Sequence, residues 1–184
     1  MTRDELEHLL RASANVLNDR ANLRRKHKFV VIGSQSILGQ YPAAPVTILQ
    51  SMEADIFPLD EPESADVIDG ALGEGSHFHE THGFYAQGVG PTTAVLPDGW
   101  KERLVKVETP ATDPGIGLCL EVHDLAISKY IAGRPKDLEF TAALARHELT
   151  RKDILLERLA TTTVDMARRK LATQRIAMHF RRRS

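Results

Sequence analysis

Two carboxylates on one short apolar segment are the residues whose types and spacing point most directly to chemistry. Glu53 and Asp55 lie two positions apart in SMEADIFP. Side chains alternate between the two faces of a β-strand, so both acids would share one face while Ala54 and Ile56 occupy the other. Neighbouring carboxylates in a partly buried sheet repel each other and lose hydration, and a divalent cation relieves both effects. The pair therefore predicts a Mg²⁺ or Mn²⁺ site, and a solvent-facing sheet edge is the simpler alternative.

A glycine and a serine end the apolar run that precedes this segment. In FVVIGSQSILGQY the run stops at Gly33 and Ser34, where a helix can begin. The first N–H groups of a helix lack intrahelical partners and favour an anion such as a phosphate. Gly33 has no Cβ and lets a ligand approach the backbone, and Ser34 adds a hydroxyl donor. An ordinary strand-to-helix turn with a serine cap is the alternative interpretation.

The hydrophobic pattern predicts the elements that must position these groups. Apolar residues at helical spacing predict an amphipathic helix over 3–24, and the continuous apolar run after KHK predicts a strand buried on both faces. A helix over 35–41, a strand in VTILQSMEADIFP and a short helix in DEPESADVIDGALG follow, and 77–109 indicates turns and short strands. A strand in GIGLCLEV then precedes a series of helices. The predicted class is α/β (α+β): a mixed sheet flanked by helices, with a C-terminal helical part.

The order of these elements divides the chain into two predicted parts. Residues 1–135 would form the α/β core with its N-terminal helix, and residues 136–184 a C-terminal helical region packed on that core. Within the second part, Thr150 and Asp153 have the spacing of a helix-capping pair.

Charge is strongly segregated along this chain of 184 residues, although the net charge is −1. Residues 53–80 hold nine acids and no Lys or Arg, whereas 165–184 hold seven Lys or Arg and one acid. Such separation indicates a cation-binding region and a basic region that attracts phosphates, or two solvated faces. With one cysteine, no membrane-spanning apolar run and no signal-peptide pattern, we expect a cytoplasmic protein without a disulfide framework.

Two segments together resemble a known family. VVIGSQSI followed by MEADIF resembles the hydrophobic-Gly-Ser and acid-x-acid signature of the minimal nucleotidyltransferases. LEVHDLAISKYIAGRPKDLEF is similar to the helix of abortive-infection-type nucleotidyltransferase toxins, which carries a lysine and then a Lys-Asp or Arg-Lys-Asp element. The resemblance covers residues 27–145 in patches, and it implies the nucleotidyltransferase fold for the core.

The resemblance also implies roles for the matching positions. The nucleotide-binding residues would be Gly33, Ser34, Lys129 and Arg134. The catalytic residues would be Glu53, Asp55, Lys129 and Asp137, of which the first two would also be the metal ligands. One departure is Glu53, where Asp is the commoner residue in the family, so this carboxylate lies one methylene further from the backbone.

The residues themselves leave alternatives open for several of these positions. Lys129 can extend its stem over apolar surface and keep its amine in water, and Asp137 can be a first-turn helix acid. Asp124 is best explained as such an acid. Glu121 is a candidate third metal acid or an exposed strand end. Three histidines in SHFHETHGF could indicate zinc, but their spacing suits neither a helix nor a strand.

Three functions remain in view. The first is a Mg²⁺- or Mn²⁺-dependent enzyme that transfers an NMP group from an NTP to RNA or protein. If the toxin-like resemblance extends to biology, the acceptor could be tRNA or a protein, and a cognate antitoxin or toxin would be the partner. The second is a catalytically weak nucleotidyltransferase-fold module that binds a partner or acts as an antitoxin. The third is a histidine-based metallohydrolase.

Overall fold

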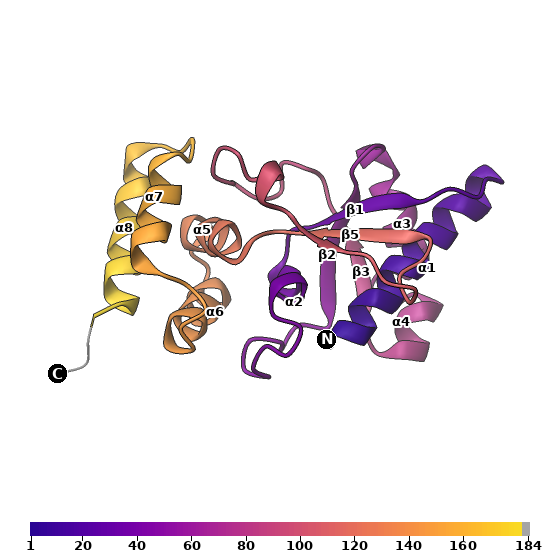
Figure 1. Ribbon diagram of the computed structural model, residues 1–184, viewed down its shortest axis with the longest axis horizontal. Coiled ribbons are helices and arrows are strands. Elements are labelled where there is room, and N and C mark those ends of the chain that lie inside the picture. Colours follow the sequence, from indigo (N-terminus) through magenta and orange to yellow (C-terminus); the bar gives the residue numbers. More distant parts are fainter. Residues whose placement is uncertain (182–184) are drawn as a thin grey trace. The chain divides into compact units, whose positions relative to one another are not determined.

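The fold is α+β, as the sequence predicts. A computed structural model describes residues 1–181, so the last three residues of the predicted C-terminal region lie outside the described chain. Among the described residues, five strands form one mixed sheet in the order β3-β2-β1-β5-β4 (Figure 1). The strands are β1 (His27–Val31), β2 (Glu53–Pro58), β3 (Tyr85–Gly88), β4 (Val105–Val107) and β5 (Gly115–Cys119).

The helices account for most of the remaining regular structure. Within residues 1–181 the α-helices are α1 (Arg3–Ala21), α2 (Ile37–Gln40), α3 (Ala65–Leu72), α4 (His77–His82), α5 (Val122–Ala132), α6 (Pro135–Arg146), α7 (Lys152–Ala160) and α8 (Met166–His179). Short 3-10 helices are η1 (Ser34–Ser36), η2 (Pro62–Ser64) and η3 (Lys101–Arg103). Each predicted helix is present, with bounds that differ by a few residues.

The chain separates into two compact units. Unit 1 comprises residues 1–93 and 104–120, and unit 2 comprises residues 94–103 and the chain from Glu121 onward. Unit 1 therefore contains the whole sheet and α1 to α4, whereas α5 belongs with the C-terminal helices. The division into domains at residue 135 stays a prediction. The two compact units divide the chain at other positions, because unit 2 includes residues 94–103 and begins again at Glu121.

In unit 1, one face of the sheet is covered by helices. Leu10 of α1 lies against Gly117 of β5, and Gly39 of α2 lies against Cys119 two residues further along the same strand. Alternation places Gly117 and Cys119 on one face, so α1 and α2 cover the same face. Val31 of β1 pairs with Cys119 and belongs to this face as well. Much of the core of unit 1 therefore lies between these helices and this side of the sheet, and Val30 and Phe57 on the other side are buried as well.

Unit 2 is a group of helices in which α5 is the most buried. α5 packs against α6, α7 and α8 (Figure 1). Its Asp124 is fully buried and accepts two hydrogen bonds from Arg103, from Nε at 2.7 Å and from Nη2 at 2.9 Å. This ion pair holds the segment 94–103, which leaves unit 1 after β3, against the helices of its own unit. Asp124 does lie in the first turn of α5, as predicted, but its guanidinium partner is the larger reason for an acid there.

Three local predictions were wrong. Residues 77–82 are the helix α4, because Ser76 accepts a hydrogen bond from the His79 N–H and caps it. Helix α7 is not capped by Thr150, since its N-cap is Arg151. Of the predicted strand in VTILQSMEADIFP, only the part from Glu53 onward is a strand.

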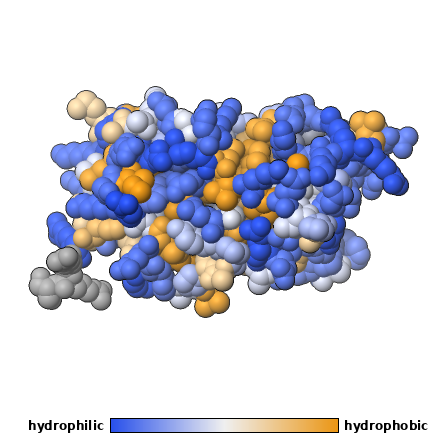
Figure 2. Space-filling view, viewed as in Figure 1, coloured by the Kyte–Doolittle hydropathy of each residue, from blue (hydrophilic) through white to orange (hydrophobic). Residues whose placement is uncertain are grey.

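The visible surface is largely hydrophilic, and apolar side chains form smaller groups within it (Figure 2). Among residues 1–181, none of the helices combines the length and the apolar character that crossing a lipid bilayer requires.

Candidate functional site

The end of β1 and the beginning of β2 lie side by side in unit 1. The two strands are antiparallel, with Val31 opposite Ile56. Beyond this pair, the Ile32 N–H donates to the Asp55 carbonyl oxygen at 3.0 Å. This register places Gly33 and Ser34, which follow Ile32, beside the start of β2, where the acidic residues lie. Gly33 and Asp55, 22 positions apart in the chain, become direct neighbours.

Gly33 is required by this contact and not by its backbone conformation. Its φ of −83° and ψ of −173° describe extended backbone that any residue adopts. A Cβ at this position would instead overlap the carboxylate of Asp55. The absence of a side chain thus lets the Asp55 carboxyl group lie directly against the main chain where β1 ends.

The two acids share the face of the sheet opposite the helices. Ile56 pairs with Val31 and faces α1 and α2, and Ala54 is buried with it. Alternation then places Glu53 and Asp55 on the other face, where both are half-buried. The predicted arrangement of the acidic pair on one face is therefore present.

A hydroxyl group from the next strand contacts this pair. β3 runs parallel to β2 with Tyr85 opposite Glu53 and Gln87 opposite Asp55. The Tyr85 hydroxyl donates to Oε2 of Glu53 at 3.1 Å. Sequence reasoning missed Tyr85, because only the register between β2 and β3 brings it to the acids.

The short helix η1 adds buried polar atoms beside the bend. Ser34 is half-exposed at its first position, whereas the next two residues, Gln35 and Ser36, are fully buried. Gln35 donates from Nε2 to the Ser51 carbonyl oxygen at 2.7 Å. Gln35 Oε1 and Ser36 Oγ have no hydrogen-bond partner within the described chain. Buried polar atoms in folded proteins usually bond to other protein groups or to ordered water.

The donor set of this region fits a hard divalent cation together with a phosphate-bearing substrate. Mg²⁺ is typically held by one or two carboxylates, and substrate phosphates and water complete its coordination. Glu53 and Asp55 offer these two carboxylates, and the space at Gly33 keeps the second one against the backbone. No group of three or more His, Cys, Asp or Glu among residues 1–181 is arranged to hold a metal ion by itself.

The histidines of SHFHETHGF have other partners. The His79 ring packs against Tyr85 with ring centroids 4.6 Å apart. The His82 ring packs against His8 of α1 at 4.7 Å. With no cluster of three metal-binding side chains among the described residues, the structure gives no support to a histidine-based metallohydrolase.

The other predicted residues meet one another in unit 2. The buried carboxylate of Asp137 accepts a hydrogen bond from Arg134 Nε at 2.7 Å and lies 3.2 Å from Lys129 Nζ. Burial by itself would raise the pKa of Asp137, but the hydrogen bond from Arg134 and the charge of Lys129 outweigh it and lower that pKa. Lys129, Arg134 and Asp137 thus form one charged cluster at the corner between α5 and α6. Glu121 has a separate role, because it caps α5 by accepting hydrogen bonds from the His123 and Asp124 N–H groups.

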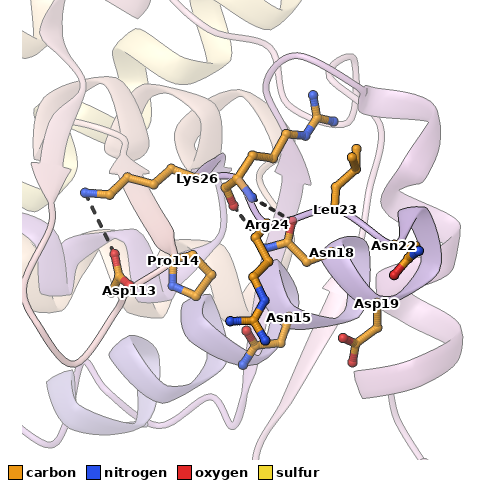
Figure 3. A pocket seen from close by; sticks show the side chains of 10 residues that line it. Asn15, Asn18, Asp19, Asn22, Leu23, Arg24, Lys26, Asp113 and Pro114 are labelled. Atoms are coloured by element: carbon orange, nitrogen blue, oxygen red, sulfur yellow. Dashed lines mark hydrogen bonds and ion pairs between the residues drawn. The ribbon is translucent and has the colours of Figure 1, made fainter.

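A polar cleft of about 880 Å³ lies at the opposite end of β1 (Figure 3). Its rim includes Arg24, Arg25 and Lys26, with Asn18 behind them. Two of these cations already have acidic partners. Arg25 forms an ion pair with Glu61, the residue that precedes η2, and Lys26 Nζ lies 2.7 Å from the Glu108 carboxylate. Acids balance the basic residues here, so this cleft is a weaker candidate for a triphosphate than the bend at Gly33.

The comparison with protein families decides the class of this chain. Residues 7–181 match the family described as "Nucleotidyltransferase of unknown function (DUF6036)". The chain belongs to this family. The match spans both units and confirms the nucleotidyltransferase-like family that the sequence predicts, whereas membership of the abortive-infection toxin subgroup stays a prediction. No curated protein and no solved structure matches the chain.

The contact between Gly33 and Asp55 gives a prediction for stability. We expect Gly33→Ala to lower the free energy of unfolding by about 1–3 kcal/mol, because the new methyl group displaces the Asp55 carboxylate or the strand end. Gly70→Ala is the matched control: Gly70 lies inside α3 with open space around its Cα, so alanine there should stabilise by roughly 0.5–1 kcal/mol. Chemical denaturation measures both values. An equal loss from Gly33→Ala in an Asp55→Ala background would contradict the explanation.

The charged cluster around Asp137 gives a second prediction, for pH dependence. We expect Asp137→Asn to lower the free energy of unfolding by roughly 1.5–3 kcal/mol at pH 7, since a buried carboxylate loses charge-assisted hydrogen bonds. The pKa of Asp137 is lowered in the folded state, so its contribution is complete above the unfolded pKa of about 3.9 and is lost as pH falls through the lower folded pKa.

Melting temperatures recorded from neutral to acid pH test this dependence. The difference between wild type and Asp137→Asn should be constant near neutrality and should shrink once the pH falls below about 4. Asp153→Asn is the control, because Asp153 is exposed and its ion pair with Arg151 lies on the surface, where such pairs contribute little to stability. A difference that grows in acid would contradict the assignment.

Proposed function

We propose that this protein is a Mg²⁺- or Mn²⁺-dependent nucleotidyltransferase that moves an NMP group from an NTP to a hydroxyl group of an RNA or protein acceptor. The observation that supports it most is the Asp55 carboxylate held against the Gly33 backbone, with Glu53 on the same face of β2. Family membership supports the reaction class. The acceptor class rests on the resemblance to abortive-infection toxins.

In the proposed reaction an acceptor oxygen attacks the α-phosphorus of the NTP. The new O–P bond forms as the bond to the β-phosphate oxygen breaks, pyrophosphate leaves, and the acceptor proton passes to solvent. A bound divalent cation would neutralise the triphosphate and activate the acceptor oxygen. Glu53 and Asp55 would hold that cation. The space at Gly33 is taken by the Asp55 carboxylate, so a phosphate would instead be held at the half-exposed Ser34 that follows, by its hydroxyl group and by the backbone N–H groups of Gly33 and Ser34.

Lys129, Arg134 and Asp137 enter the proposal as a group. Lys129 and Arg134 remain the predicted phosphate contacts, because each carries a positive charge at the matching position. Asp137 holds both of their side chains in unit 2, so we assign it the role of orienting these two cations. This assignment differs from a direct catalytic role, which rests on the resemblance alone.

One observation favours a second candidate, a nucleotidyltransferase-fold module that binds nucleotide or a partner with little turnover. Glu53 replaces the commoner Asp, and its Oε2 accepts a hydrogen bond from the Tyr85 hydroxyl. A longer side chain that is already engaged in a hydrogen bond could hold a cation in a geometry that disfavours transfer. NTP binding without incorporation would identify this candidate.

Labelled-NTP incorporation tests the enzyme. The full chain is incubated with each α-³²P-labelled NTP, Mg²⁺ or Mn²⁺, and either total RNA or a bacterial protein extract as acceptor. We expect Asp55→Asn to reduce incorporation on the order of 100-fold, because losing about 3 kcal/mol of transition-state stabilisation has this effect. Asp153→Asn, an exposed acid of α7, is the matched control and should retain full activity.

Each outcome distinguishes the candidates. Incorporation that persists in Asp55→Asn at the wild-type level would overturn the proposed site. Incorporation into RNA or into protein identifies the acceptor class. Growth arrest on expression of wild type but not of Asp55→Asn would support the toxin-like role, and its absence in both would argue against that role.

A further inference from the structure

A tyrosine hydroxyl is bonded to one of the two proposed metal-binding acids. Tyr85 and Glu53 are partners in the parallel register between β3 and β2, so their side chains leave the sheet on the same face. The Tyr85 hydroxyl donates to Oε2 of Glu53 at 3.1 Å. This hydrogen bond selects one orientation for a carboxylate at the end of a flexible side chain.

The ring of Tyr85 is itself held in place by α4. The His79 ring packs against it at 4.6 Å between centroids. His79 is held in turn by two hydrogen bonds. Its ring Nδ1 accepts from the Gly75 backbone N–H at 3.0 Å, and the His79 backbone N–H donates to Ser76 Oγ at 3.2 Å. The cap of α4 by Ser76 and the contact between the His79 and Tyr85 rings therefore both help to keep Tyr85 beside Glu53.

The Tyr85 hydroxyl is the donor in this contact. An ionised carboxylate can only accept hydrogen bonds, whereas a phenol carries an O–H group that donates. The Tyr85 oxygen lies 3.1 Å from Oε2 of Glu53, within hydrogen-bond distance. The geometry therefore makes Tyr85 a donor that holds one carboxylate oxygen in place.

We propose that Tyr85 is a positioning residue, which holds the Glu53 carboxylate in the orientation that binds a divalent cation together with Asp55. The inference rests on the proposed function, because it assigns Tyr85 a role toward the same cation. Hydrogen-bond partners of metal-binding groups typically change metal affinity or activity by 10–100-fold when they are removed, roughly the effect expected here.

The affinity for Mn²⁺ alone, measured by electron paramagnetic resonance on the full chain, tests this role. We expect Tyr85→Phe, which keeps the ring and its packing on His79, to weaken Mn²⁺ binding by roughly 10-fold or more. Tyr130→Phe is the matched control and should bind as wild type does, since the Tyr130 hydroxyl lies 3.0 Å from the His179 ring nitrogen Nδ1 in unit 2. In a Glu53→Gln background, Tyr85→Phe should have no further effect.

An NMR measurement on the wild-type chain at neutral pH tests the same role if Tyr85→Phe does not fold. The chain has three tyrosines, so ¹³Cζ-labelled tyrosine gives three signals. Tyr41→Phe and Tyr130→Phe assign the remaining signal to Tyr85. Mg²⁺ should shift the Tyr85 signal in wild type, because a cation at Glu53 withdraws charge from the hydrogen bond, and Glu53→Gln should abolish this shift.

The outcomes separate the two proposals. If wild type and Tyr85→Phe bind Mn²⁺ equally, or if Mg²⁺ leaves the Tyr85 signal unmoved while Asp55→Asn still loses binding, the role of Tyr85 is overturned and the cation site stands. If wild type binds neither cation, both proposals are overturned.

Discussion

The arrangement of unit 1 depends on one close approach, that of the Asp55 carboxylate to the backbone of Gly33. It exists because β1 and β2 are antiparallel in a register that continues one residue beyond the strand, from the Ile32 N–H to the Asp55 carbonyl oxygen. A slip of one residue would turn both acids toward the helix-covered face, where two charges would be desolvated among Leu, Val and Ile side chains. Burial of the apolar face therefore fixes where the carboxylates can be.

A related constraint operates in unit 2, where buried carboxylates organise the cations around them. α5 is buried on nearly all sides, so a charge on or near it must be neutralised locally. Asp124 is met by Arg103 and Asp137 by Lys129 and Arg134. Asp137 thereby holds the side chains of Lys129 and Arg134, two predicted phosphate contacts, close together. This structural role explains the acid without any direct part in catalysis.

Local patterns predicted the parts of this protein that local physics determines. The apolar run of β1, the alternation of β2 and the glycine that ends α5 all depend on residues a few positions apart, and each is present. What the sequence could not provide is register. Tyr85 reaches Glu53 only through the pairing of β2 with β3, and Arg103 reaches Asp124 only because the segment 94–103 belongs to unit 2. Helix α4 was missed because its cap, Ser76, stands among glycines and histidines that are typical of turns.

The substitution of Glu for Asp at position 53 has a physical reading in this fold. A glutamate side chain reaches one methylene further and has one more rotatable bond, so by itself it would hold a cation less rigidly than aspartate. The Glu53 carboxylate also accepts a hydrogen bond from the hydroxyl of Tyr85 on the neighbouring strand. If Glu53 holds a cation as proposed, the hydrogen bond from Tyr85 would restrict the longer acid and so compensate for its extra rotatable bond. On this view the departure from the family pattern at position 53 and the tyrosine at position 85 are explained by the same interaction.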